Sequence, residues 1–525
     1  MSKRLPHEIE IRVPPEKLHD ETFEREALSK ALGVAAAELP PTRLIRRSLD
    51  ARGKAAVYLL RFLVGRQGDP APFAEVLKLQ NVSKAEPVII VGFGPAGMFA
   101  ALRLIELGFK PVILERGKAV RDRRHDIAAI TKRGIVNPDS NYCFGEGGAG
   151  TFSDGKLYTR ATKRGSVDRI LQIFVAHGAD PEIRIDAHPH IGTNKLPKVV
   201  QTIREQVVAC GGEMHFNSRV SKIVRSGSAI RGVILQDGTE VLSKAVILAA
   251  GHSSRDLFQA LVEDGYHLEQ KPFALGVRVE HPQPLIDAIQ YRSSGRSEHL
   301  PPAAYALKAQ CAGRGVFSFC MCPGGIICPS ATANDEVVVN GWSPSKRNSR
   351  FANSGIVVQV TDEDLQSFNS AGALAGIALQ QSLERHAALL GGGVQAAPAQ
   401  RLDDFVNKRE SKSLPECSYL PGVRAVNLDL LFPDAFASRL RAAFRDFDKQ
   451  RPGYLTNEAL VVGVESRTSC PVRVPRDRET MMHLGTDGLF PVGEGAGYAG
   501  GIVSAAMDGE NAADAVQKFL LSAAR

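Results

Sequence analysis

A glycine-rich turn between two apolar segments constrains this chain more than any other feature. Residues 88–91 are continuously apolar, as in a parallel strand that is buried on both faces. Gly92, Gly94 and Gly97 follow in GxGxxG spacing. In such a turn the first glycine permits the tight bend, the second lets the backbone approach a pyrophosphate, and the third lets the next helix pack closely on the strand. The pattern predicts a βαβ unit that binds phosphate at the N-terminus of its helix.

The second strand of this unit ends in an acidic residue. Residues 112–114 are apolar, and Glu115 follows them, 23 residues after Gly92. An acid in this place accepts hydrogen bonds from a ribose 2′-hydroxyl, which implies an adenosine without a 2′-phosphate. Because strand, glycines, helix and acid occur in register, we interpret the segment as a dinucleotide site. On these residues alone, NAD and FAD fit equally well.

The order of the predicted strands, turns and helices indicates an α/β fold with four consecutive parts. Short alternating runs at 8–13, 42–49 and 56–64 and a helical pattern near 24–32 predict a small N-terminal α+β module over 1–82. Strand, glycine turn and helix then alternate in a Rossmann-type domain, whose first part is 83–270 and whose C-terminal part is 461–525. The proline-rich stretch between them, with strand-like runs such as 336–339 and 356–360, predicts an inserted α+β substrate or cap domain over 271–460.

The composition is that of an ordinary globular protein, with 44% hydrophobic and 23% charged residues. No apolar stretch follows the charged N-terminus, and no run approaches about 18 apolar residues without glycine or proline, so we expect neither a secretory signal nor a membrane span. The expected location is cytoplasmic, with the eight cysteines reduced. The net charge of +8 is typical of a solvated surface but leaves anionic substrates and nucleic acid among the partners to consider.

Two downstream segments resemble flavoproteins of the glutathione-reductase-type fold. Residues 217–254 consist of short alternating strands, an Asp-Gly turn and an apolar strand into Ala-Ala-Gly, like the β-meander of that FAD domain. Residues 487–516 resemble its C-terminal flavin motif. The resemblance implies that Val220 lies at the adenine and Gly251 near the dinucleotide. It also implies that Glu494 holds the ribityl chain, where many relatives have Asp, and that the helix after Gly500 and Gly501 points at the flavin pyrimidine ring.

A third segment, 141–160, follows the second strand and is rich in glycine. With 187–197 and 487–505 it is similar to a group of uncharacterised FAD-dependent dehydrogenases, and that resemblance covers nearly the whole chain. It implies that free backbone N–H groups of this segment, and the side chains of Ser153 and Lys156, reach the phosphates or the ring. No metal is expected. The expected FAD-binding residues are Gly92, Gly94, Pro95, Ala96, Gly97, Glu115, Arg116, Gly147, Gly148, Gly150, Thr151, Val220, Ala250, Gly251, Gly493, Glu494, Gly500, Gly501 and Ile502.

The catalytic residues stay open. Four residues precede a predicted amphipathic helix: His188, His190, Thr193 and Lys195. They either donate protons to the substrate and bind it, or they only pack against the helix and cap it, and the sequence favours neither alternative. Glu465, Arg467 and Arg473 lie just before the C-terminal flavin motif. Arginines there either clamp an anionic substrate or form internal ion pairs, which is the commoner arrangement.

Four cysteines, Cys311, Cys320, Cys322 and Cys328, are spaced C-x8-C-x-C-x5-C. This spacing matches neither zinc nor ferredoxin patterns. Strand alternation over 317–322 puts the two phenylalanines and Met321 on one face and Cys320 and Cys322 on the other, which favours buried, inert thiols. The alternative is a redox role for Cys320 or Cys322 beside the flavin.

The favoured function is an FAD-dependent oxidoreductase that passes hydride between a small-molecule substrate and flavin N5. No second GxGxxG follows a strand, so no separate NAD(P)H-binding domain is expected. The electrons come from NAD(P)H bound transiently at the flavin, from the substrate itself or from another electron carrier. One alternative is a flavin monooxygenase. Another is an RNA-associated flavoprotein, because residues 43–66 contain seven Lys or Arg and only Asp50 as a counter-charge, although a solvated strand face explains this better.

Overall fold

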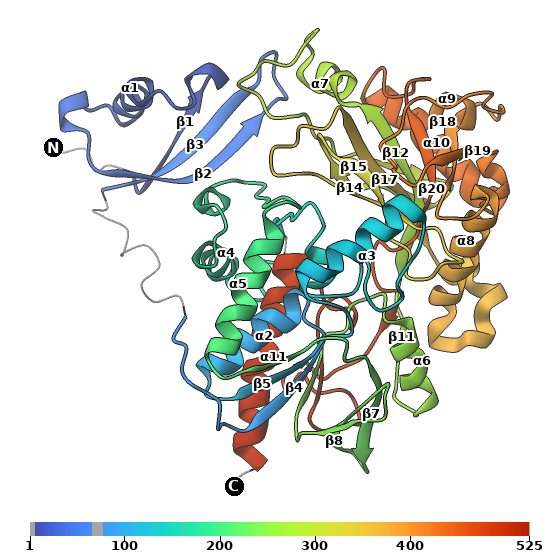
Figure 1. Cartoon of the computed structure of the whole chain (residues 1–525). Helices are drawn as coiled ribbons and strands as arrows, with labels where there is room; N and C mark the ends of the chain where they lie inside the picture. The colour runs from blue at the N-terminus through green and yellow to red at the C-terminus, as the bar shows by residue number, and fades with distance from the viewer. Residues whose placement is uncertain (1–5, 66–76, 160, 524–525) are drawn as a thin grey trace.

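A five-stranded parallel sheet forms the base of the molecule (Figure 1). The computed structural model describes residues 6–65, 77–159 and 161–523. The strand order is β22-β10-β4-β5-β6, with bounds β4 (Pro87–Val91), β5 (Lys110–Leu114), β6 (Glu213–His215), β10 (Val246–Leu248) and β22 (Leu489–Pro491). The central strand β4 is continuously apolar because helices or strands cover both of its faces, as the sequence predicted. The Rossmann-type α/β fold is confirmed.

Helices pack on one face of this sheet and a small antiparallel sheet extends from it (Figure 1). The helices are α2 (Pro95–Glu106), α4 (Val167–Ala176), α5 (Leu196–Ala209) and α11 (Ile502–Ala523). Helix α3 (Val120–Arg133) lies nearer the upper lobe, and α6 (Arg255–Glu263) packs beside the small antiparallel sheet. The small sheet is β7 (Val220–Ser226), β8 (Ala229–Leu235) and β9 (Glu240–Leu242), the predicted meander. Helix α11 approaches α2 so closely that a Cβ on Gly509 would lie 2.0 Å from the Ala96 carbonyl oxygen.

The inserted domain is built on a seven-stranded sheet of order β13-β14-β17-β12-β20-β18-β19. Its strands are β12 (Phe273–Pro282), β13 (Lys308–Cys311), β14 (Arg314–Cys322), β17 (Phe351–Val360), β18 (Ala397–Arg401), β19 (Val423–Ala425) and β20 (Leu460–Glu465). Since β20 pairs with β12, this sheet continues past the predicted boundary at 460 to Glu465. The run 336–339 is not a strand except at its last residue, where β16 (Val339–Trp342) begins.

Smaller elements complete the inserted domain. They are α7 (Gln283–Tyr291), α8 (Ala375–Gly391), α9 (Leu402–Val406), α10 (Asp434–Gln450) and β15 (Ile326–Pro329), which pairs with β16. The two-stranded pair β11 (Glu269–Gln270) and β21 (Val472–Arg473) marks the two crossings of the chain between the large domains. The core of the domain contains a cluster of edge-to-face aromatic rings around Phe444, Phe447 and Tyr454.

The N-terminal module is a separate small lobe at the upper left of Figure 1. Its sheet has the order β1-β3-β2, and α1 (Glu21–Leu32) packs on it; the strands are β1 (Glu8–Val13), β2 (Thr42–Asp50) and β3 (Val57–Val64). The predicted strands and helix are therefore confirmed. Arg47 of β2 joins the module to the dinucleotide domain, with ion pairs to Glu182 at 2.8 Å and Asp186 at 2.8 Å. Part of the basic stretch thus forms internal contacts, and Arg66 lies outside the described residues.

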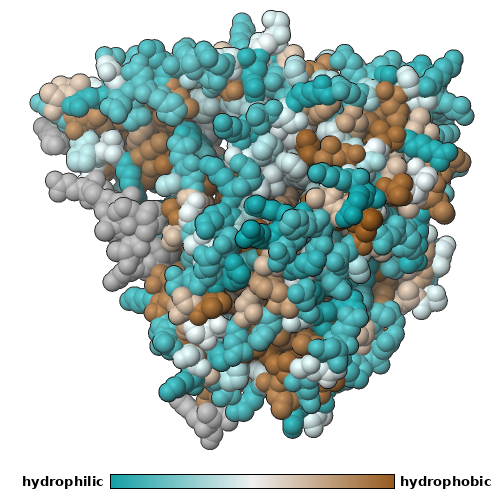
Figure 2. Space-filling model, in the orientation of Figure 1, coloured by the Kyte–Doolittle hydropathy of each residue, from teal (hydrophilic) through white to brown (hydrophobic). Residues whose placement is uncertain are grey.

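No described helix is long and apolar enough to cross a lipid bilayer. The face of the molecule in Figure 2 is mainly hydrophilic, with hydrophobic residues in separate small patches.

One buried histidine of the inserted domain makes stability depend on pH. The ring of His281, at the end of β12, lies 4.5 Å from that of Tyr454, and its Nε2 lies 2.9 Å from the Tyr454 carbonyl oxygen. Burial lowers the pKa of His281 to about 4, from 6.5 when exposed. Between pH 6.5 and 4 the unfolded chain therefore binds a proton that the folded chain does not, and stability falls as the pH falls.

Replacing this histidine is expected to reduce the sensitivity to acid. His281→Gln keeps an amide donor for the Tyr454 carbonyl and cannot be protonated. The free energy of unfolding, measured by denaturant titration, should fall between pH 7 and pH 4.5 in both proteins. We expect this fall to be about 2 kcal/mol smaller in His281→Gln than in the wild type. Replacing the exposed His299 by Gln is the control. Equal losses in all three proteins would contradict the assignment.

Candidate functional site

A cavity of about 390 Å³ opens at the carboxyl edge of the parallel sheet. Three loops that follow neighbouring strands line it: the turn after β4, residues 249–254 after β10, and residues 492–494 after β22. Because β5 lies on one side of β4 and β10 on the other, this edge is the switch point at which open α/β sheets bind their ligands. The inserted domain closes the cavity with Phe319, Cys320 and Asn340.

The turn after β4 brings backbone against backbone. Gly92 has φ +96°, and a Cβ on it would lie 2.6 Å from the Ala249 carbonyl oxygen. A Cβ on Gly97 would lie 2.1 Å from the Gly92 carbonyl oxygen. Side chains at these two positions would separate β4, β10 and α2, so the glycines are required by packing. This is the spatial basis of the spacing seen in the sequence.

Glu115 joins three segments of the cavity wall. Its buried carboxylate accepts hydrogen bonds from the backbone N–H groups of Phe93 and Gly117, each at 2.9 Å, and Gly145, at 3.0 Å. The side chain also lines the cavity, where remaining lone pairs of its oxygens can accept ribose hydroxyls. Glu115 thus positions the glycine turn and the glycine-rich segment relative to each other before any ligand binds.

Two helix N-termini meet the cavity. Helix α2 begins at Pro95, after Gly94, and helix α11 begins at Ile502, after Gly501, and all four residues line the cavity. Each N-terminus presents N–H groups without intrahelical partners and the positive end of a helix dipole. The arrangement suits a ligand with two electron-rich parts, one a pyrophosphate and the other a ring that gains negative charge.

All but three of the predicted cofactor-binding residues line this one cavity. They are Gly92, Gly94, Pro95, Ala96, Glu115, Arg116, Gly148, Gly150, Val220, Ala250, Gly251, Gly493, Glu494, Gly500, Gly501 and Ile502. The exceptions, Gly97, Gly147 and Thr151, do not line it. Thr151 is buried and donates its hydroxyl to the Glu146 carbonyl at 2.7 Å.

The backbone N–H groups of the glycine-rich segment are less free than the sequence suggested. The Gly147 N–H donates to the Phe93 carbonyl at 2.9 Å, and the Gly148 N–H donates to the Gly145 carbonyl at 2.8 Å. These bonds close the segment against the glycine turn. Arg116 likewise has partners within the protein, since it pairs with Asp139 at 2.9 Å and with Asp256 at 3.0 Å.

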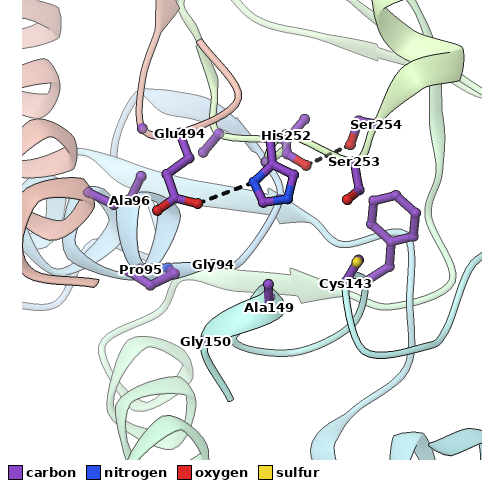
Figure 3. A pocket seen from close by; sticks show the side chains of 18 of the residues that line it. Gly94, Pro95, Ala96, Cys143, Ala149, Gly150, His252, Ser253, Ser254 and Glu494 are labelled. Atoms are coloured by element: carbon purple, nitrogen blue, oxygen red, sulfur yellow. Dashed lines mark hydrogen bonds and ion pairs between the residues drawn. The ribbon is translucent and has the colours of Figure 1, made fainter. Parts of the chain in front are cut away.

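His252 and Glu494 face each other within the cavity (Figure 3). The Nδ1 atom of His252 lies 3.3 Å from a carboxylate oxygen of Glu494. Glu494 follows β22 and His252 follows β10, so the parallel pairing of these strands creates the pair. Below them in Figure 3 lie the first turn of α2 and the loop at Ala149 and Gly150.

The histidines near α5 lie outside the cavity wall. The ring of His188 packs against that of Tyr158 at 5.0 Å, and the Nε2 atom of His190 lies 3.2 Å from the Ser345 carbonyl oxygen. Burial lowers the pKa of both histidines. Lys195 is the N-cap residue of α5, and the Thr193 N–H donates to the Ser343 carbonyl. These contacts favour the packing and capping alternative.

The candidate clamp residues form internal ion pairs. Arg467 lines the cavity, but its guanidinium binds Glu336 at 2.8 Å and Glu384 at 2.9 Å. Glu465 pairs with the fully buried Arg278 at 2.8 Å. Arg473 lies 3.7 Å from Glu269 and is not part of the cavity. The commoner of the two alternatives is therefore the observed one.

The predicted alternation of the cysteine strand is wrong at one point. The register of β14 against β17 shifts between Phe319 and Cys322, and Cys320 has φ +47°. This bulge places both Phe319 and Cys320 at the cavity. No group of three or more metal-ligating side chains occurs in the described ranges.

The sequence also missed several lining residues. His252, Ser253 and Ser254 directly follow the Ala-Ala-Gly turn, so their place next to that motif was a usable signal. Phe319 and Asn340 come from the inserted domain and follow Ser254 by more than sixty positions in the sequence. Only the tertiary fold brings them to the cavity.

Residues 272–468 match a family model described as the C-terminal-domain-like part of FAD-dependent proteins. An uncharacterised protein of Clostridium beijerinckii is 38% identical to the chain over 514 residues, which cover 94% of this chain and 95% of the relative. The chain belongs to this family of FAD-dependent proteins. A second model, a domain of unknown function, matches residues 5–64 of this FAD-dependent protein.

Two solved structures are among those similar to the chain. The crystal structure of CtdE in complex with FAD has 12% identity and a TM-score of 0.34, over 84% of this chain and 88% of that one. A geranylgeranyl bacteriochlorophyll reductase-like protein of Thermoplasma acidophilum has 13% identity and a TM-score of 0.35, over 83% of this chain and 80% of that one.

The residues of the cavity fit FAD, the cofactor of the family. A glycine cradle that a Cβ would fill lies beside one helix N-terminus, a buried carboxylate with lone pairs free for a ribose lies at the end of β5, and a second helix N-terminus also lines the cavity. The chain thus offers a partner for each polar part of the cofactor.

Gly92→Ala is expected to abolish tight FAD binding, because the new Cβ would force the Ala249 carbonyl out of place. Gly178→Ala is a matched control, since Gly178 has a similar φ of +99° but no atom within 4 Å of the added Cβ. Both variants carry the cost of a side chain at positive φ, about 1 kcal/mol. The ratio of flavin to protein absorbance after purification should fall roughly tenfold only in Gly92→Ala. Equal ratios in the two variants would contradict the role of the turn.

Proposed function

We propose that this protein is an FAD-dependent oxidoreductase that transfers hydride between a small organic substrate and the flavin. The observation that carries the proposal is the shared cavity, whose walls come from both the dinucleotide domain and the inserted domain. A cofactor held by the first domain would therefore have its reactive ring under residues of the second. When bound, FAD supplies the two-electron chemistry, and the protein supplies position and electrostatics.

In this proposal the glycine turn and the N-terminus of α2 hold the pyrophosphate, and Glu115 holds the adenosine ribose. Val220, at the start of the meander, would contact the adenine. The N-terminus of α11 would face the pyrimidine part of the ring, where its dipole would favour the negative charge of a reduced flavin. Each role is supported by the place of the residue in the cavity wall.

We assign the ribityl chain to Glu494. Its carboxylate can accept a hydrogen bond from a ribityl hydroxyl, while His252 fixes its orientation from the other side at 3.3 Å. Glu is one methylene longer than the Asp of many similar flavoproteins, and His252 holds that extra length in place. The pair therefore positions the cofactor and has no assigned part in proton transfer.

The substrate is expected to bind between the ring and the inserted domain. Phe319 and Asn340 offer an apolar face and an amide there, and Lys156 and Ser153 of the glycine-rich segment add polar groups. Lys156 is already bound to Asp154 at 3.2 Å and to the Met321 carbonyl at 2.6 Å, so its charge is held in place. A small, partly polar organic molecule fits these groups.

The function is tested by mixing the FAD-loaded protein with NADH or NADPH without oxygen while the flavin absorbance is recorded. We expect at least one of the two to bleach the absorbance at a rate that saturates with its concentration, and free FAD is the control. Bleaching by neither would contradict nicotinamide as the hydride donor. Admission of oxygen then separates the rival activity, because a monooxygenase would yield hydroxylated product in place of hydrogen peroxide.

Glu494→Gln is expected to weaken FAD binding without unfolding the protein. A hydrogen bond to a charged group contributes about 1.5–3 kcal/mol, so the Kd of FAD should rise roughly tenfold or more. Fluorescence titration of the apoprotein with FAD measures this, with the exposed Glu479→Gln as the control. An unchanged Kd in Glu494→Gln would remove the ribityl assignment.

A further inference from the structure

Two cysteines of β14 meet at the edge of the cavity. The β-bulge after Phe319 removes Cys320 from the regular ladder and directs it to the cavity, whereas Cys322 is fully buried directly behind it. The Cys322 thiol donates a hydrogen bond to the Cys320 carbonyl oxygen at 3.2 Å, and both sulfurs lie within 3.6 Å of the same Lys156 Nζ atom. Bulges commonly re-aim a side chain next to an active site.

Two cations surround this pair. The Nζ atom of Lys156 lies 3.6 Å from each of the two sulfurs. The buried guanidinium of Arg278 donates to the Cys320 carbonyl at 2.8 Å and lies 3.7 Å from the Cys322 sulfur. The nearby carboxylates are Asp154, which binds Lys156 and Arg347, and Glu465, which binds Arg278.

This environment favours a thiolate on Cys320. The hydrogen bond from Cys322, followed by the charges of Lys156 and Arg278, lowers the pKa of Cys320 well below its ordinary value. The same hydrogen bond and burial raise the pKa of Cys322, so the proton stays there. Other buried thiols behave differently, since burial raises the pKa of Cys328 and of Cys470 to about 12. Cys320 therefore has the electropositive, accessible setting of a reactive cysteine.

We propose that Cys320 and Cys322 are a redox-active dithiol that exchanges two electrons with the bound FAD. The inference rests on the proposed function, because it needs the flavin in this cavity. In the oxidising direction the Cys320 thiolate and the Cys322 thiol form one S–S bond, and the S–H bond of Cys322 breaks. Two electrons and that one proton would pass to the bound FAD, which supplies two-electron chemistry, so charge and atoms balance. Lys156 and Arg278 hold the thiolate in place before the step.

The number of electrons that the protein accepts tests this proposal. Protein oxidised in air should contain the disulfide, so an anaerobic dithionite titration should consume about four electron equivalents per FAD, two for the flavin and two for the disulfide. Cys320→Ser and Cys322→Ser should each consume about two. Cys210→Ser, at the end of α5 and away from the cavity, should behave as the wild type.

Alkylation followed by peptide mass spectrometry gives a second measurement that does not depend on turnover. Cys320 and Cys322 should be protected from alkylation in air-oxidised FAD-loaded protein and labelled after the titration. Cys322→Ala, which also lacks the thiol, covers the case in which the serine variant fails to fold. Uptake of two equivalents by the wild type, with both cysteines labelled throughout, would overturn the dithiol while leaving the proposed function intact. If dithionite does not bleach the flavin of the wild-type protein, both the redox-active dithiol and the proposed function are overturned.

Discussion

One buried carboxylate organises the functional end of the molecule. Glu115 accepts three backbone N–H groups, from the turn after β4, from its own loop and from the glycine-rich segment near Gly145. Loops carry unpaired backbone groups that need partners when they are buried, and a charged acceptor satisfies several of them at once. The cavity wall is therefore preorganised, and a cofactor meets formed surfaces instead of having to order them.

A second set of buried charges fixes the inserted domain over that wall. Glu384 of α8 binds Arg255 of α6 at 2.7 Å and Arg467 at 2.9 Å, and Arg467 also binds Glu336. Burial alone would raise the pKa of Glu384, but the two guanidinium groups hold it far below its ordinary value. Removing one partner would leave an uncompensated buried charge, which typically costs 3–5 kcal/mol. These ion pairs connect the two large domains beside the cavity, whose wall includes Arg467.

Local rules explain which predicted residues reach the cavity and which do not. The glycine spacing, the acid at Glu115 and the turn at Glu494 depend on near neighbours in the chain, and each lies in the cavity wall. Thr151 does not line the cavity, and its hydroxyl donates to a backbone carbonyl, a contact that depends on how the loop folds. Cys320 was misplaced because strict alternation cannot foresee a bulge, which arises from the register with β17.

The sequence by itself determined the cofactor-binding half of this protein. Gly92 and Gly97 leave no room for a Cβ, and an apolar strand followed by such glycines has few other folds available. Only the tertiary structure decided what faces the cavity from the inserted domain. Lys156 and Cys320 are more than a hundred and sixty positions apart, yet their side-chain atoms lie 3.6 Å from each other. Contacts between distant segments depend on how two domains pack, and no periodicity within either segment encodes that packing.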